Sequence, residues 1–108
     1  MSEISVKPHL SAIAAIAARL GVRVEIDDLG EWGAAALIAE YDPDGPIIRV
    51  NRRMLPAAPS AAFRAAIDRA VAHELYHRCE DLGTVPRLRG LRARERAAEA
   101  FAAQLCRS

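Results

Sequence analysis

The stretch AVAHELYHRCED, from Ala70 to Asp81, decides how the rest of the chain is interpreted. It ends a predicted helix that follows Ser60, a residue type favoured at helix N-caps, and that runs from about residue 61 to residue 79 or 80. Two stripes of apolar side chains follow this helix at i, i+4 spacing, namely Phe63, Ile67, Val71 and Leu75, and Ala62, Ala66 and Ala70. A helix that is apolar on both sides is expected to be buried, so this segment is predicted to lie in the core.

The second stripe leads into a pair of histidines. His73 and His77 lie four residues apart, with Glu74 beside the first of them. On a helix this spacing places both imidazoles on one face, where they can bind one Zn²⁺ ion. Glu74 can reach a water molecule on such a metal and act as general base. The pattern therefore predicts a zinc hydrolase with His73 and His77 as ligands and Glu74 as catalytic residue.

Two other interpretations of the histidine pair remain open. The histidines can be exposed on an ordinary helix, or they can be satisfied by hydrogen bonds within the core. Burial of the helix favours a metal, because buried imidazoles need partners and a metal ion is an effective one.

A catalytic zinc ion keeps three protein ligands and one open position, so a third ligand is expected. The candidates are Glu80, Asp81, Glu95, Glu99, Cys79, which is turned away from the histidines, and Cys106, near the chain end. Glu80 shares the face of His77, but three ligands from one straight helix converge poorly on a tetrahedral centre. Glu95 is the charged member of an apolar stripe on the last predicted helix, whereas Glu99 lies on a more polar face. The sequence thus favours Glu95 as third ligand, and the alternative is a salt bridge between Glu95 and an arginine such as Arg94.

Periodicity and turn residues predict the remaining elements. They are a helix from about Ser5 to Leu20, ended by Gly21, strands at Val22 to Ile26, Ala36 to Asp42 and Ile47 to Asn51, and a helix from about Leu91 to Leu105. The turn Pro43 to Gly45 should join the last two strands as a hairpin. We therefore expect an α+β fold in a single domain, residues 1–108, with a small three-stranded antiparallel sheet between the first helix and the helix of the histidines.

Composition narrows the class of protein further. The 108 residues are 52% apolar and 27% charged, which is typical of one globular domain, and a net charge of +1 argues against nucleic-acid binding. The arginine-rich run Pro86 to Arg96 lacks interleaved aromatic residues and is more typical of a solvated surface. With no apolar run of about 20 residues and no signal-peptide pattern, we expect a cytoplasmic protein without a membrane partner and with reduced cysteines.

Three segments together resemble the ImmA/IrrE family of small metallopeptidases. NRRM begins at Asn51, the end of a predicted strand, FRAAIDRAVAHELYH spans the histidine motif, and ERAAEAFAAQL contains Glu95. The family shows a strand ending in Asn, an apolar-His-Glu-Leu-x-His helix, and a later Glu-x-x-Ala-Asn-x-Phe-Ala helix. The resemblance covers roughly Val22 to Leu105 and implies a zincin-like fold with one Zn²⁺ per chain. The implied ligands are His73, His77 and Glu95, with Glu74 as base.

The resemblance also implies a function, namely a metalloendopeptidase that cleaves a helix-turn-helix repressor of a phage, mobile element or stress regulon. The chain departs from the family at Tyr76, where Gly is usual, at Glu99, where Asn is usual, and in its ending LCRS, after which no sensor or DNA-binding domain is expected. Tyr76 and Asn51 are candidate substrate or oxyanion contacts. The strand Ile47 to Asn51 is either an edge strand that binds substrate or an internal hairpin strand.

A second hypothesis comes from a different class of function. The protein can be a non-cleaving binding module, such as an antirepressor or a toxin–antitoxin partner, in which zinc is structural or absent. The small size of the chain and Tyr76 favour this hypothesis, whereas the three ligand positions and Glu74 favour the enzyme.

Overall fold

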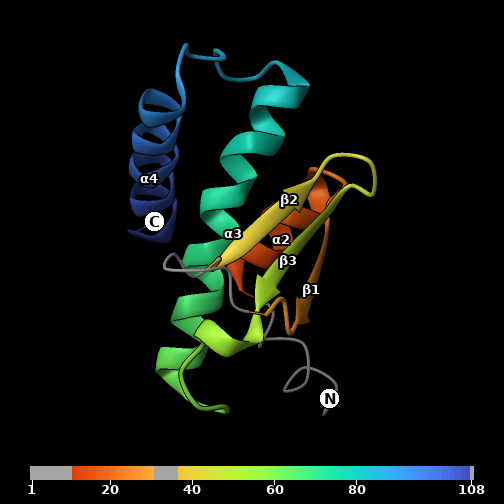
Figure 1. The fold of residues 1–108 in the computed structure, drawn as a ribbon, viewed down its shortest axis with the longest axis vertical. Coiled ribbons are helices and arrows are strands. Elements are labelled where there is room, and N and C mark those ends of the chain that lie inside the picture. The colour runs from red at the N-terminus through yellow and green to blue at the C-terminus, as the bar shows by residue number, and fades with distance from the viewer. Residues whose placement is uncertain (1–10, 31–36, 108) are drawn as a thin grey trace, which may run out of the picture.

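The computed structural model describes residues 11–30 and 37–107, which form three α-helices, a short 3-10 helix and a three-stranded sheet (Figure 1). In chain order the elements are α2 (Ala12–Arg19), β1 (Arg23–Asp27), β2 (Ala39–Asp42), β3 (Ile47–Asn51), η2 (Arg52–Met54), α3 (Ala61–Leu82) and α4 (Leu91–Arg107). The α+β class expected from the sequence is confirmed. The long helix α3 lies between the sheet and α4, and α2 packs against α3 and β1 (Figure 1).

The sheet is mixed, with strand order β1-β3-β2. β2 and β3 form the predicted antiparallel hairpin, in which Ala39 lies opposite Val50. β1 pairs with β3 in parallel, with Val24 opposite Ile48, so the prediction of an antiparallel sheet is wrong for this strand. Side chains alternate with period two in both kinds of pairing, so the alternation in β1 carries no information about its direction. β3 is therefore internal, which excludes it as a substrate-binding edge, and within the described residues β2 is an edge strand.

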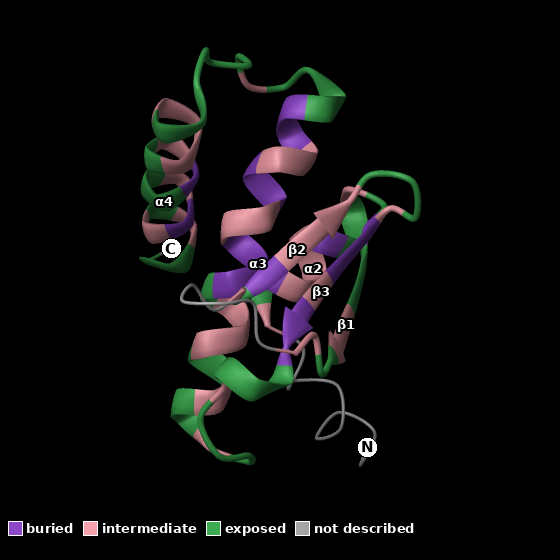
Figure 2. Ribbon diagram, in the orientation of Figure 1, coloured by how far each residue is buried: buried purple, intermediate pink, exposed green. Residues whose placement is uncertain are grey.

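The core lies where α2 and α3 cover the sheet and where α4 covers α3. Ile48 and Val50 of the central strand are fully buried, as is Leu75 of α3 (Figure 2). On α4 the buried residues are Ala98 and Ala102, both with no exposed surface. Because alanine side chains are small, α4 can approach α3 closely along this line. This close approach positions the beginning of α4 beside the histidine motif.

Capping residues set the ends of α3. The Ser60 hydroxyl oxygen accepts a hydrogen bond from the Phe63 N–H at 3.0 Å, which confirms the predicted N-cap. The helix continues to Leu82, further than predicted, because Gly83 takes the left-handed conformation with φ of 77° and ends it there. The additional residues keep Glu80 within the helix, on the same side as the second histidine.

The other boundaries differ slightly from the predictions. α2 is capped by the Ser11 hydroxyl, which accepts from the Ala14 N–H, and Gly21 follows its end with φ of 74°, as expected. The predicted helical residues 5–10 and the predicted strand residue 36 lie outside the described residues. α4 extends to Arg107, two residues beyond the prediction. Among the helices of the described part, none is long and apolar enough to cross a membrane.

Candidate metal centre

Three predicted ligands come together where α3 packs on α4. His73, His77 and Glu95 each offer one ligand atom, and these atoms lie within 4.8 Å of one another. Nε2 of His73 is 2.9 Å from one carboxylate oxygen of Glu95, and Nε2 of His77 is 3.3 Å from the other. Ligand atoms about 2.0–2.1 Å from a tetrahedral zinc ion lie roughly 3.3 Å apart. The donor set and its spacing therefore fit a zinc ion.

The two helices contribute differently to this cluster. The i, i+4 spacing on α3 holds the rings of His73 and His77 with their centroids 5.7 Å apart, and about one-sixth of each side chain is exposed. Glu95 contacts both histidines, which contradicts the alternative that its main partner is an arginine. Its side chain is 44% exposed, and Leu91 one turn earlier is 72% exposed, so the predicted apolar stripe is buried only from Ala98 onward. The stripe thus selected a residue that lies beside both histidines, although that residue is at the edge of the core.

A second carboxylate lies behind each histidine. Nδ1 of His73 is 2.8 Å from Glu99, and Nδ1 of His77 is 3.0 Å from Glu80. When a histidine donates its Nδ1 hydrogen to a carboxylate, the Nε2 lone pair is free to bind a metal, and the ring is held in one orientation. Both imidazoles are therefore oriented with Nε2 toward the shared space beside Glu95.

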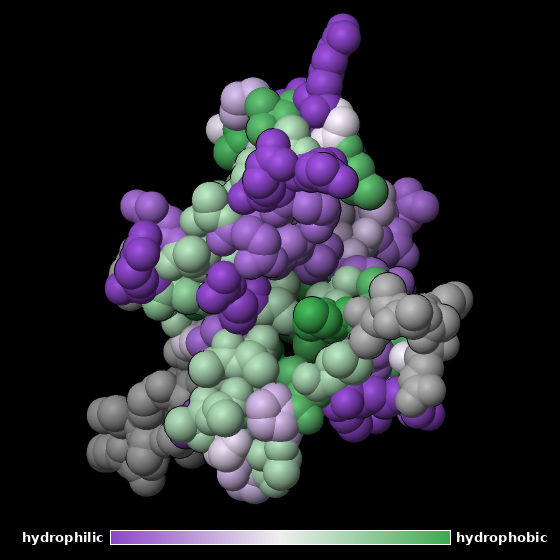
Figure 3. Space-filling view, turned by 60° about the vertical axis from the view of Figure 1, so that its left-hand side comes forward, coloured by the Kyte–Doolittle hydropathy of each residue, from purple (hydrophilic) through white to green (hydrophobic). Residues whose placement is uncertain are grey.

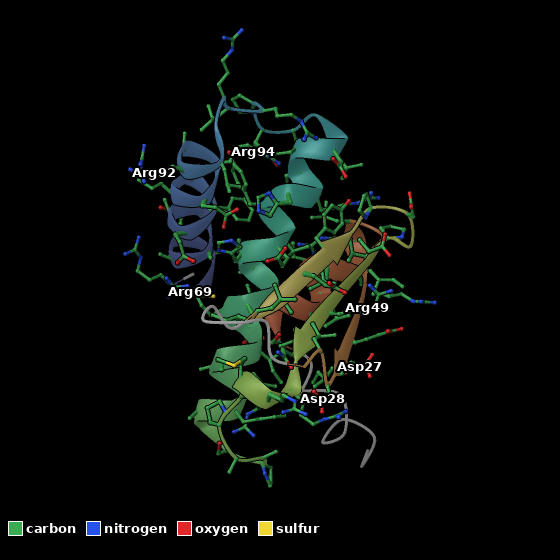
Figure 4. All side chains as sticks on the ribbon, in the orientation of Figure 1. Asp27, Asp28, Arg49, Arg69, Arg92 and Arg94 are labelled. Carbon is green, nitrogen blue, oxygen red and sulfur yellow. The ribbon has the colours of Figure 1, made fainter. Side chains whose placement is uncertain are left out.

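Arginines hold these outer carboxylates in turn. Arg94 donates two hydrogen bonds to Glu80, at 3.0 and 2.7 Å, and Arg69 donates one to Glu99 at 3.1 Å. Glu80 is buried, and the hydrogen bonds from Arg94 lower the pKa of its carboxyl group to about 2. In Figure 4, Arg94 lies on the side of α4 that faces α3, whereas Arg92 projects from the outer side. The cluster is thus a network of ion pairs that joins the two helices.

Sequence reasoning missed the role of two of these carboxylates. Glu99 lies on the more polar face of the last helix, as expected, with its side chain 58% exposed. Because residues four apart, such as Glu95 and Glu99, lie on nearly the same side of a helix, Glu99 also reaches His73. Glu80 was considered only as a third ligand, whereas its i, i+3 relation to His77 allows it to orient that ring. The i, i+4 spacing of Glu95 and Glu99 and the i, i+3 spacing of His77 and Glu80 are the features of the sequence that could have indicated these two roles.

Glu74, the predicted base, lies at the junction of two cavities. One has a volume of about 490 Å³ and the other about 320 Å³, and Glu74 and Glu95 line both. His73 lines the first cavity and His77 the second, so the two cavities adjoin at the candidate metal centre, and together they are called the cleft. Burial raises the pKa of Glu74 to about 7, despite the two histidines, which lower it. A carboxyl group of this kind can take up and release a proton near neutral pH.

The edge strand β2 forms the opposite wall of this cleft. Ala39 lines the larger cavity and Tyr41 the smaller one. The Tyr41 hydroxyl donates a 2.8 Å hydrogen bond to Asp81 on α3, and burial raises the pKa of Tyr41. The cleft therefore runs between an open strand edge on one side and the histidine face of α3 with α4 on the other.

Tyr76 lies elsewhere than the sequence suggested. It is buried between α3 and α4, with its ring 5.7 Å from the His77 ring and 5.6 Å from the Phe101 ring, centroid to centroid, and it lines neither cavity of the cleft. This position gives Tyr76 a packing role beside one ligand. It does not support the predicted contact with substrate or an oxyanion.

Asn51 is a structural residue in this fold. Its side chain is fully buried, donates to the carbonyl oxygens of Gly30 and Leu37, and accepts hydrogen bonds from the N–H groups of Leu29 and Arg53. Three of these bonds, to Leu29, Gly30 and Leu37, connect the end of β3 to the segments before and after the undescribed residues 31–36, and the bond from Arg53 caps η2. An amide used in this way cannot contact a substrate in the cleft, so the prediction of a substrate or oxyanion contact is not supported.

The cysteines take no part in the centre. Cys79 is buried, Cys106 is exposed, and both are free thiols. Of the candidate third ligands, Asp81 accepts hydrogen bonds from Tyr41 and Arg87 instead.

Comparison with known proteins returned no match to a protein-family model, to a curated protein or to a solved structure. The fold and the site therefore define this chain as an α+β domain with a group of two histidines and a glutamate that could hold a metal ion. The family resemblance in the sequence stays a prediction.

Proposed function

We propose that this protein is a zinc-dependent peptidase of the zincin-like, ImmA/IrrE kind, with one Zn²⁺ held by His73, His77 and Glu95. The observation that carries the proposal is the convergence of these three candidate ligands with a cavity on either side, both of them lined by Glu74. A purely structural zinc site usually has four protein ligands, whereas three leave a position for a reacting molecule.

Bound zinc would supply a Lewis acid and lower the pKa of a water molecule in the cleft. Glu74 is the residue placed to act on that water, because it lines the cleft on both sides of the ligands. As the water oxygen adds to the peptide carbonyl carbon, Glu74 accepts a proton. It then gives the proton to the amine nitrogen, and the carbon–nitrogen bond breaks. Glu80 and Glu99 keep the two imidazoles oriented throughout.

The edge strand supports a peptide as substrate. The Asn51 N–H donates to the Ile38 carbonyl at 2.8 Å, and bonded pairs alternate along an antiparallel ladder. The backbone groups of Ala39 and Tyr41 therefore point away from β3, toward the open edge, and these two residues line the cleft. An extended peptide can add to this edge and pass Glu74. Following the resemblance, we propose a helix-turn-helix repressor as the protein substrate.

A second candidate function is that of a binding module that does not cleave its partner. The observation in its favour is that every ring nitrogen of the two histidines lies beside a carboxylate: three are hydrogen-bonded, and Nε2 of His77 is 3.3 Å from Glu95. In that case the cluster is an ion-pair network that fastens α4 to α3, and zinc is structural or absent.

The variant Glu74→Gln separates the two functions. Zinc-loaded wild type should cleave a denatured test protein such as casein, and the variant should bind zinc within about twofold of wild type but lose 100-fold or more in cleavage rate. Glu25→Gln, on β1 away from the cleft, is the control for a lost carboxylate. If Glu74→Gln binds zinc and cleaves the test protein as fast as wild type does, the proposal that Glu74 is the base is contradicted. Full biological effect of the variant would favour the binding module.

A further inference from the structure

The two halves of the cleft differ in chemistry. The half beside His73 is lined mainly by apolar residues from β2, its preceding segment, η2 and α3, namely Leu37, Ile38, Ala39, Met54, Ala66 and Ala70. The half beside His77 is lined mostly by polar and charged residues, among them Asp81, Arg87 and Arg94. A substrate that spans the cleft therefore meets an apolar surface on only one side of the candidate metal centre.

Besides Glu74 and Glu95 at the candidate metal centre, the charged side chains that line the apolar half, Arg69 and Glu99, are paired with each other. Arg69 donates to one oxygen of Glu99, and the other oxygen of Glu99 lies 2.8 Å from Nδ1 of His73. These side chains therefore offer little net charge to a ligand. A charged substrate side chain entering this half would lose hydration without gaining a free partner among them.

Two large apolar side chains in this half are exposed. Ile38 is 55% exposed and Met54 is 41% exposed, and both line the same cavity. Figure 3 shows strongly hydrophobic surface beside a hollow on this face of the molecule. Covering such surface with an apolar group is favourable, and the cavity of about 490 Å³ lies within the usual range for ligand pockets, roughly 300–1,000 Å³.

We propose that this half of the cleft is a subsite for an apolar side chain of the peptide, adjacent to the bond that is cleaved. The inference rests on the proposed peptidase function and adds a substrate preference to it. Ile38, Met54 and the alanines of α3 form the subsite. A leucine-sized side chain is stabilised there by burial of its apolar surface, whereas an aspartate or a lysine would lose hydration of its charge.

The test uses peptides that are identical except at one position, which carries Leu, Ala, Asp or Lys in a Gly/Ser frame. Cleavage by zinc-loaded wild type is measured with the cut located by mass spectrometry. Binding to zinc-loaded Glu74→Gln is measured separately by fluorescence anisotropy, so that the result does not depend on turnover. We expect the Leu peptide to be cleaved about tenfold faster or more than the Asp peptide, and to bind about tenfold more tightly or more.

Variants locate the preference within the cleft. Met54→Asp and Ile38→Asp should each reduce the preference for Leu about tenfold, with little change in stability because both side chains are exposed. Leu88→Asp is the matched control, since Leu88 is 40% exposed and lines neither half of the cleft. An undiminished preference in both cleft variants would overturn the assignment of the subsite.

The two readouts also separate this inference from the proposed function. Cleavage without any preference among the peptides would overturn the subsite and leave the peptidase intact. A preference for Leu in binding, without cleavage by wild type, would support the subsite and contradict the peptidase. Equal binding of all four peptides together with no cleavage would overturn both.

Discussion

Arg94 and Glu80 form a two-pronged ion pair across the helix interface, with Nε and Nη2 of Arg94 at 3.0 and 2.7 Å from the two oxygens of Glu80. The oxygen nearer to Nη2 is also 3.0 Å from Nδ1 of His77. Arg94 directly precedes Glu95, the candidate third ligand, on α4. One ion pair therefore joins the packing of α4 on α3 to the orientation of the His77 ring, a candidate metal ligand.

Arg94→Ala should weaken both stability and metal binding. The substitution leaves the carboxylate of Glu80 buried without its cation, so we expect the free energy of unfolding of the metal-free protein to fall by about 3 kcal/mol. Because His77 loses its fixed orienting partner, zinc affinity should fall roughly 10–100-fold. Urea denaturation and a zinc titration measure the two effects. Arg92→Ala, on the exposed side of the same helix, should change stability by no more than about 0.5 kcal/mol.

The same ion pair predicts how stability depends on pH. The pKa of Glu80 is about 2 in the folded protein and 4.5 in a free glutamate, so its contribution is fully present above pH 4.5 and is lost as the pH falls toward 2. We expect the metal-free wild type to lose about 3 kcal/mol more than Glu80→Gln over this range. Urea denaturation of both proteins at a series of pH values is the measurement. If the free energy of unfolding depends on pH in the same way in both proteins, the lowered pKa of Glu80 is contradicted.

Zinc binding should depend on Glu95. After dialysis against a weak chelator, wild type should keep about one zinc per chain by elemental mass spectrometry, and Glu95→Ala should lose most of it because two histidines alone hold zinc weakly. Glu25→Ala removes a glutamate of similar exposure, 41% against 44%, and should keep its zinc. Absence of zinc from wild type, even when zinc is supplied, would favour the ion-pair network without metal.

Asn51→Ala should damage the fold and leave the metal centre unchanged. The substitution removes four hydrogen bonds between the side chain and the backbone and leaves buried polar groups without partners, so we expect a loss of roughly 2–4 kcal/mol in the free energy of unfolding. Zinc content of the folded fraction should match wild type, since Asn51 lies outside the ligand cluster. A stable variant with altered peptide binding would instead restore Asn51 as a substrate contact.

The local parts of this fold could be predicted from the sequence because short-range physics determines them. The N-cap at Ser60, the left-handed glycine after α2 and the β2–β3 hairpin each depend on a few neighbouring residues. The grouping of His73 with His77 depends only on the helical repeat. Glu95 could be selected because a carboxylate within an apolar stripe needs a specific partner.

Long-range contacts could not be predicted in the same way. The parallel pairing of β1 with β3 depends on how the chain crosses between β1 and β2. The alternation of apolar residues in a strand does not depend on that crossing, so it could not predict the direction of β1. The buried positions of Tyr76 and Asn51 arise from the packing of separate segments, so their places in the family motif could not indicate that these side chains point away from the cleft. Residue spacing could have identified Glu80 and Glu99, but their arginine partners depend on how α4 docks.

The open edge of β2 also affects how separate molecules of this protein meet. A strand without a neighbour on one side can pair with the same strand of another copy, which is a common route to aggregation. β2 has only four residues, and its alternate positions Glu40 and Asp42 carry carboxylates that Arg49 of the same chain holds at 3.0 and 3.6 Å. Two such edges brought together would place like charges close to each other across a very short ladder. The strand can therefore stay available to a peptide while resisting self-association.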